Sequence, residues 1–330
     1  MTVIDKIVFE GHFSELCVRL IHYKRSIGYK YEARTLRALR QMNEYLSLCY
    51  TDRNGHDYSL SKDVVLKYTA RRANENPRTQ SMRQSVIRQL AIFLDSLGIE
   101  AYILPLRKKK EHSTFTPYIF TVQQITDILS ITDNLEYAYR SPNCHYAYRF
   151  LIRLLYGCGL RISEALALKI EDIDFAEGVL RIQQAKYNNS RLVPMSDSLR
   201  ASFHKYMVHV GYSETDKGFL FRTRWNKPYR ANSILQRFKK FLQEAEITHT
   251  ENGNSPRLHD LRHTFAVHAL EHMALQGLDT YCSIPYLATY MGHRKIACTE
   301  QYLRLTSESY ENIISALTPM YKNLFPGGDV

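Results

Sequence analysis

The sequence lacks the short motifs that identify several common classes of enzyme. It contains no glycine-rich Walker A loop, no cluster of carboxylates like those that hold two metal ions in nucleases, and no cysteines and histidines paired at a zinc-binding spacing. It also has no internal repeat and no low-complexity segment, which excludes solenoid and disordered proteins. The sequence therefore gives no signal for a metal, a nucleotide or a repeat architecture.

Signals for disulfide bonds, secretion and membrane insertion are absent as well. The 6 cysteines have no CxxC spacing, and most lie in apolar helical contexts that favour reduced, packed thiols: they are Cys17, Cys49, Cys144, Cys158, Cys282 and Cys298. The N-terminus does not have the pattern of a signal peptide, and no run of about 18 apolar residues could span a bilayer. These absences predict a cytoplasmic protein.

Positive charge is the clearest feature of the composition. The chain has 330 residues, a formal net charge of +11 and a pI of about 9.2, which indicates a polyanionic partner. Residues 1–110 hold 20 Lys and Arg against 11 Asp and Glu, so +9 of this charge lies in the first third. A chain of this length has room for two domains, and the positive charge belongs mainly to the first.

The first domain, residues 1–104, is predicted to be a small helical bundle. Apolar residues recur at helical spacing from Phe13 toward Gly28, over 35–48, after Ser61 as a cap, and over 81–97. Its polar faces are rich in cations, which as a set we interpret as a surface for DNA phosphates, although solvation explains any single residue as well. These cations are Lys24, Arg25, Lys30, Arg34, Arg37, Arg40, Arg71, Arg72, Arg78, Arg83 and Arg88.

A basic linker over residues 105–116 is predicted to join the two domains. Pro105 interrupts regular structure, and four consecutive cations repel one another into an extended conformation. Near a phosphate track they would also release counterions on binding, whereas a nuclear-localisation signal is the competing interpretation. The four cations, which we predict to bind DNA, are Arg107, Lys108, Lys109 and Lys110.

The second domain, residues 117–330, is predicted to be mainly helical with a small β-hairpin, so the whole chain is of the α+β class. Thr121 and Gln124 form a capping-box pattern that opens the first helix. Residues 179–184 and 190–194 alternate like two strands around a polar turn. Helices are also predicted over 146–156, 196–210, 231–245, 296–303 and 307–324.

Polar residues of the second domain gather at the ends of these elements. Arg161 begins a helix after Gly159, where unpaired backbone N–H groups favour an anion, and Glu164 can hold the geometry of a site there. Lys186 projects from the hairpin turn. These positions point to an anion-binding site, whereas each residue alone is explained equally well by capping or by a surface ion pair.

The last quarter of the chain adds four candidates for the same site. His259 and Arg262 are three apart on one helix, so they can reach one phosphate. Gly292 ends the next helix in the left-handed position that glycine adopts without strain, which places His293 at a helix terminus. Tyr302 follows on a short helix over 296–303.

In this order, the residues resemble the tyrosine recombinases, a family of phage integrases, Xer-type resolvases and mobile-element transposases. The resemblance covers roughly residues 121–305, although Ala185 and Tyr187 stand where the family has glycines. It implies that Tyr302 attacks a DNA phosphodiester to give a 3′-phosphotyrosine and a free 5′-hydroxyl, without a metal or other cofactor. The six positions that carry the resemblance are Arg161, Lys186, His259, Arg262, His293 and Tyr302.

The resemblance also implies a role for each residue. Arg161 and Arg262 would clamp the phosphate, because a guanidinium donates bidentately to it and stays charged. His259 would act as the base, His293 as a hydrogen-bond donor, and Lys186 as the acid that protonates the leaving 5′ oxygen.

The implied partners are double-stranded DNA, further copies of this chain and, where a site requires them, DNA-bending accessory proteins. The first domain would clamp the duplex. The apolar helix over 307–324 would either fold back on its own chain or cross to a neighbouring protomer, and the second arrangement would close a tetramer on DNA. The extra residues around Pro285 favour a mobile-element integrase or transposase. A type IB topoisomerase and a non-catalytic DNA-binding regulator on the same fold are the alternatives.

Overall fold

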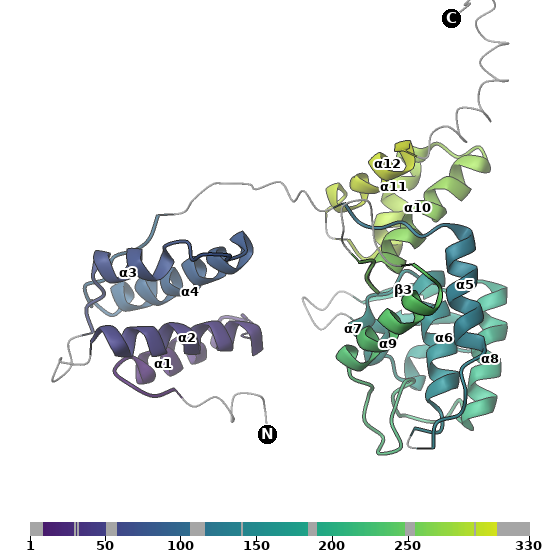
Figure 1. The fold of residues 1–330 in the computed structure, drawn as a ribbon, viewed down its shortest axis with the longest axis horizontal. Coiled ribbons are helices and arrows are strands. Elements are labelled where there is room, and N and C mark those ends of the chain that lie inside the picture. Colours follow the sequence, from purple (N-terminus) through teal and green to yellow (C-terminus); the bar gives the residue numbers. More distant parts are fainter. Residues whose placement is uncertain are drawn as a thin grey trace, which may run out of the picture. The chain divides into compact units, whose positions relative to one another are not determined.

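The computed structural model describes the chain in two compact units, residues 1–113 and 114–330 (Figure 1). The described residues are 9–29, 31, 33–50, 58–105, 116–139, 141–183, 190–247, 255–293 and 295–308, with the backbone alone described for 303–308. Within these ranges, none of the helices combines the length and the apolar character needed to span a bilayer.

The first unit contains the four predicted helices: α1 (Ser14–Ser26), α2 (Ala33–Cys49), α3 (Lys62–Thr69) and α4 (Pro77–Ser96). Their apolar stripes, with Leu20, Met42 and Leu90 among them, are buried against one another. The predicted cap of α3 is present, since the Ser61 hydroxyl accepts a hydrogen bond from the Val64 N–H. Helix α4 begins four residues earlier than predicted, because the Asn76 side chain caps it and Pro77 fits its first turn.

Arg83 corrects the interpretation of the basic surface. Its side chain is buried and donates to the carbonyl oxygens of Tyr68 and Ala70 and to the Glu75 carboxylate, the last at 2.5 Å. A buried guanidinium with these partners fixes the segment between α3 and α4. Arg83 is therefore a buried residue that stabilises the first unit, and the prediction that it faces DNA was wrong.

The described part of the second unit is built from eight α-helices, one short 3-10 helix (Ile170–Asp172) and one sheet. Its capping box is confirmed, since the Thr121 hydroxyl accepts from the Gln124 N–H while the Gln124 side chain accepts from the Thr121 N–H. Helix α12 packs on α10 and α11 (Figure 1), and it runs past the predicted end at Leu303. The helices are α5 (Val122–Asp133), α6 (Cys144–Gly157), α7 (Ile162–Ala167), α8 (Asp197–Val210), α9 (Ala231–Glu244), α10 (Asp260–Leu275), α11 (Thr280–Met291) and α12 (Ala297–Glu308).

The sheet of the second unit has three antiparallel strands in the order β1 (Ile173–Asp174), β2 (Val179–Ile182) and β3 (Arg191–Pro194). The hairpin of β2 and β3 was predicted, and its register pairs Val179 with Pro194. Strand β1 was missed, because two residues carry no periodicity that a sequence pattern could reveal. The mainly helical α+β fold is confirmed.

Four predictions fall outside the described residues. They are the cation Lys30 of the first domain, the hairpin turn with Lys186, the linker cations Arg107 to Lys110, and the part of the 307–324 helix beyond α12.

The cysteines are all free, but only two of them are buried. Cys17 and Cys158 are the packed thiols that the apolar contexts predicted, and burial raises the pKa of both to about 12. Cys49, Cys282 and Cys298 lie on exposed faces instead. Apolar neighbours in the sequence therefore did not decide which side of a helix each thiol occupies.

Candidate active site

Arg262 joins the turn between α6 and α7 to the end of α11. Its guanidinium is 2% exposed and donates to the carbonyl oxygens of Gly159 and Met291, the latter at 2.7 Å. Gly159 has φ +57°, and a Cβ there would lie 2.4 Å from the ring of Phe265, so both the conformation and the space require glycine. Burial and the charge of Arg161 lower the pKa of Arg262 to about 10, which leaves it charged at neutral pH.

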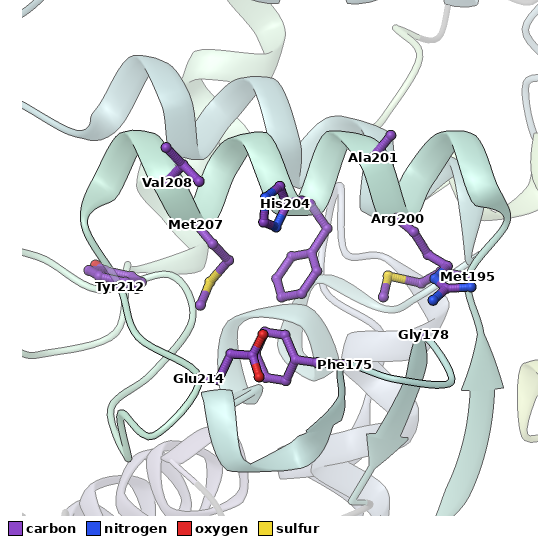
Figure 2. Close-up of a pocket in the computed structure, with 11 residues that line it drawn as sticks. Phe175, Gly178, Met195, Arg200, Ala201, His204, Met207, Val208, Tyr212 and Glu214 are labelled. Atoms are coloured by element: carbon purple, nitrogen blue, oxygen red, sulfur yellow. The ribbon is translucent and has the colours of Figure 1, made fainter.

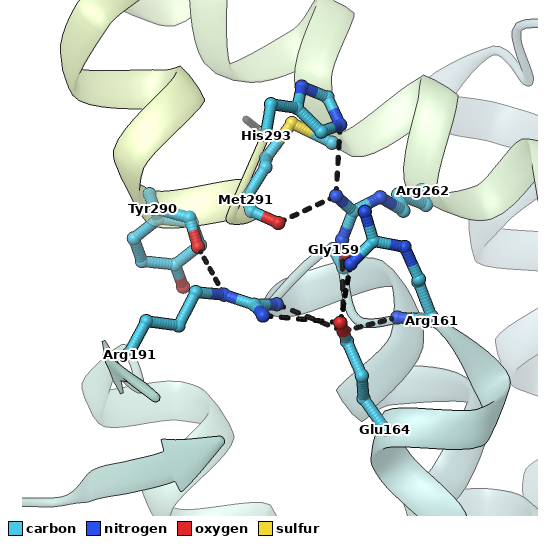
Figure 3. A network of polar contacts seen from close by, with 8 residues as sticks. All are labelled: Gly159, Arg161, Glu164, Arg191, Arg262, Tyr290, Met291 and His293. Carbon is cyan, nitrogen blue, oxygen red and sulfur yellow. Dashed lines mark hydrogen bonds and ion pairs between the residues drawn. The ribbon is translucent and has the colours of Figure 1, made fainter. Parts of the chain in front are cut away.

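Glu164 is the carboxylate at the centre of the site, and three arginines converge on it (Figure 3). The sequence predicted that Glu164 accepts hydrogen bonds from nearby donors, and the backbone N–H and the side chain of Arg161 both donate to it, at 2.9 and 2.5 Å. Arg191 donates to both carboxylate oxygens at 3.2 and 2.9 Å, and Arg262 lies 3.9 Å away. Burial raises the pKa of Glu164, but the hydrogen bonds from Arg191 and Arg161 outweigh it and bring the pKa to about 2.

Arg191 is a residue of this site that the sequence did not suggest. It begins β3, its side chain is nearly buried, and its Nε donates to the carbonyl oxygen of Tyr290 at 2.8 Å. Arg191 therefore ties the hairpin strand both to Glu164 and to the last turn of α11 (Figure 3). Its place directly after the polar turn was visible in the sequence, but its contacts join residues 27 and 99 positions apart.

Tyr302 is 1% exposed, and its hydroxyl hydrogen bonds with Nδ1 of His263 at 2.9 Å. His263 follows Arg262 directly and was not predicted as a site residue. Burial raises the pKa of the Tyr302 phenol, while the positive charge of Arg262 acts in the opposite direction. Burial also lowers the pKa of His263 to about 4, so its imidazole is neutral at pH 7 and can accept a proton.

His293 and His259 flank this pair. His293 follows Gly292, which has φ +68° as predicted, and its ring stacks on that of Tyr302 with centroids 6.2 Å apart. Its Nε2 lies 3.0 Å from the Arg262 guanidinium. His259 is exposed at the first turn of α10, and its ring packs edge-on against His263 at 4.9 Å.

The structure thus gathers every described candidate into one cluster on α7, α10, α11 and α12. Arg161, whose side chain is 35% exposed, and His259 are open to an incoming phosphate, whereas Arg262 and Tyr302 lie beneath them. Two guanidinium groups and three imidazoles around one phenol are suited to stabilise phosphate charge and to move protons. Lys186 is the one predicted catalytic residue outside the described ranges.

A separate pocket of about 380 Å³ lies elsewhere in the second unit, between α8 and the turn that joins β1 to β2 (Figure 2). Its lining includes Phe175, Met195, Arg200 and His204. None of the predicted site residues that the structure describes lines this pocket, so we place the candidate active site at the Glu164 cluster.

The chain is similar to known integrases and recombinases over most of its length. The family model "Phage integrase family" matches residues 119–309. The putative integrase/recombinase y4rB of Sinorhizobium fredii is 27% identical over 88% of this chain and 92% of its own length. The tyrosine recombinase XerA of Pyrococcus horikoshii is 25% identical over 86% of this chain and 88% of its own length.

Two solved structures share the fold. A XerH site-specific recombinase bound to a palindromic difH substrate has a TM-score of 0.64 at 14% identity, covering 92% of this chain and 84% of that one. The Tn1549 transposon integrase in complex with transposon right-end DNA has a TM-score of 0.57 at 18% identity, covering 90% and 98%.

Proposed function

The chain belongs to the phage integrase family and is a tyrosine-type site-specific recombinase, and we propose that Tyr302 is its nucleophile. The observation that carries this proposal is the position of the Tyr302 hydroxyl, which hydrogen bonds with His263 and lies in one cluster with Arg262 and His293. Attack of the phenol on a DNA phosphodiester would leave a 3′-phosphotyrosine and a 5′-hydroxyl. The later attack of that hydroxyl, or of one from another strand, would rejoin the DNA.

Each residue has a role that its surroundings support. Arg161 and Arg262 bind the nonbridging oxygens, and Glu164 holds Arg161 in place. His263, which hydrogen bonds with the phenol, accepts its proton in place of His259, the base that the resemblance implies; His259 lies beside it at the exposed edge of the site. Lys186 protonates the leaving 5′ oxygen, as the resemblance implies.

The buried phenol sets a condition for cleavage. With the residue 1% exposed and its hydroxyl held by His263, Tyr302 reaches a phosphate only after its side chain turns away from His263. Binding of DNA, which brings negative charge to Arg161 and His259, is the event that we propose favours this movement.

The wider biological role is also a proposal. The helices of the first unit and the linker cations clamp double-stranded DNA, and four protomers assemble on two sites, with accessory DNA-bending proteins where the site needs them. The similarity of this fold to that of a transposon integrase supports a role in integrating, excising or transposing a mobile element within the cytoplasm. A type IB topoisomerase would form the same covalent bond, but as a monomer and without exchange of partners.

Strand cleavage is expected to proceed in excess EDTA, because arginines take the place of metal ions in stabilising phosphate charge. A duplex nicked near the cleavage point should trap the protein as a covalent adduct on a denaturing gel, in equal yield with and without the chelator. A strict requirement for magnesium would contradict the proposed chemistry, and a protein that binds the site but never forms an adduct would be the non-catalytic regulator.

Deletion of residues 309–330 is expected to leave binding to one site intact but to abolish the pairing of two sites. The sequence of this segment carries an apolar stripe that needs a partner, and in the proposed assembly the partner is a neighbouring protomer. Native mass spectrometry of the complexes on paired sites measures the number of protomers. Deletion of residues 325–330, beyond the stripe, is the matched control. Four-protomer complexes of the shorter chain would contradict the exchange.

A further inference from the structure

His293 is held between two side chains of different hydrogen-bonding character. Its Nε2 lies 3.0 Å from Nη2 of Arg262, and its Nδ1 lies 2.8 Å from Oγ1 of Thr299. A guanidinium only donates hydrogen bonds, so Nε2 must accept from it. The ring is therefore neutral with its proton on Nδ1, and Nδ1–H donates to the Thr299 hydroxyl.

The side chain of Thr299 is positioned to support the ring of His293. It is fully buried on the first turns of α12, one helical turn before Tyr302, so it links the helix of the nucleophile to the histidine. A hydroxyl is the side-chain group that both accepts and donates. Burial, followed by the charge of Arg262, lowers the pKa of His293 to about 4, so the neutral ring is the form that the surroundings favour.

The hydrogen-bonding role of Nε2 changes when a phosphate enters the site. A phosphate oxygen only accepts hydrogen bonds, so Nε2 must then carry a proton. A neutral ring meets this need by losing the proton on Nδ1 to solvent and gaining one on Nε2, with no change in its charge. The Thr299 hydroxyl then turns and donates to Nδ1, so the ring keeps a partner on that side in both states.

We propose that Thr299 is a positioning residue for His293, which fixes the plane of the imidazole and lets it present either a lone pair to Arg262 or an N–H to the phosphate. This inference rests on the proposed function of the site. It adds to that function a buried residue on α12 whose effect on strand cleavage is exerted through His293.

The test compares Thr299→Val, which keeps the shape and loses the hydroxyl, with Thr299→Ser, which keeps the hydroxyl. In single-turnover cleavage of a nicked duplex by the full chain, the Val variant is expected to be slower by about 10- to 100-fold, with its Kd for DNA within about twofold of the wild type. The Ser variant should stay within about threefold of the wild-type rate. A Val variant that cleaves at the wild-type rate overturns the proposal.

A double-mutant cycle separates positioning from a general effect on folding. In a His293→Ala background, Thr299→Val should slow cleavage no further, because the residue through which it acts is gone. Equal effects in both backgrounds overturn the proposal. Nitrogen-15 spectra of the free protein provide a readout that does not depend on activity, since they distinguish the two neutral tautomers, and an Nε2–H form of His293 also overturns it. If Tyr302→Phe still formed the adduct, the proposed function itself would fail, whichever result Thr299 gave.

Discussion

Replacing Tyr302 with phenylalanine is expected to abolish covalent attachment to DNA while leaving site binding within about twofold of the wild type. The substitution removes the phenolic oxygen and its hydrogen bond with His263, but it keeps the ring that packs among Val267, Leu270 and Met291. Loss of one such hydrogen bond costs about 1 kcal/mol of folding free energy, so the second unit stays folded. Adduct formation on a nicked duplex and a DNA-binding titration measure the two effects separately.

Tyr156 provides a matched control for this experiment. Its hydroxyl hydrogen bonds with Nδ1 of His268 at 2.9 Å, the same kind of contact at the same length as the one between Tyr302 and His263. Tyr156→Phe therefore removes an equivalent hydrogen bond from α10 without touching the proposed nucleophile, and its adduct yield should match the wild type. An adduct that survives in Tyr302→Phe would show that another residue attacks the DNA.

The elements of this fold that the sequence predicted are those specified by neighbouring residues. The capping box of Thr121 and Gln124, the Ser61 cap and the left-handed Gly292 each depend on a few consecutive positions, and all three are present. The helical stripes of the first unit were also correct in their apolar residues, because burial of one face follows directly from a period of 3.6.

The contacts that escaped prediction depend on packing between distant segments. His263 lies next to Arg262 in sequence, yet its contact with Tyr302 exists only because α12 folds onto α10. Arg191 meets Glu164 only because β3 lies beside α7 in the folded unit. Arg83 shows the reverse, since its place on a basic face suggested solvent while backbone carbonyls of Tyr68 and Ala70 enclose it. The helical pattern around a cation does not indicate which hydrogen-bond acceptors will surround its side chain.

Replacing Glu164 with glutamine is expected to destabilise the second unit by about 3–5 kcal/mol, because it leaves the nearly buried guanidinium groups of Arg191 and Arg262 without their counter-charge. Strand cleavage should fall as well, since Arg161 loses the carboxylate that orients it. Urea unfolding followed by hydrogen exchange on peptides of α7 and α10 reports the stability of this unit alone. Glu171→Gln is the matched control: it breaks the exposed pair with Lys169, and its urea midpoint should match the wild type.

The pH dependence of the stability difference between wild type and Glu164→Gln identifies the cause of that difference. The pKa of Glu164 is lowered to about 2 in the folded protein, so the unfolded chain binds its proton more readily. The stability that this carboxylate contributes is therefore fully present above its unfolded pKa near 4.5 and is lost as the pH falls toward 2. The gap between the urea midpoints of wild type and Glu164→Gln should narrow from pH 5 to pH 3, because protonation of Glu164 in the unfolded wild-type chain stabilises that state over this range, whereas glutamine does not titrate. A gap that stays constant over this range would mean that the variant loses packing rather than charge, and that the arginines do not depend on Glu164.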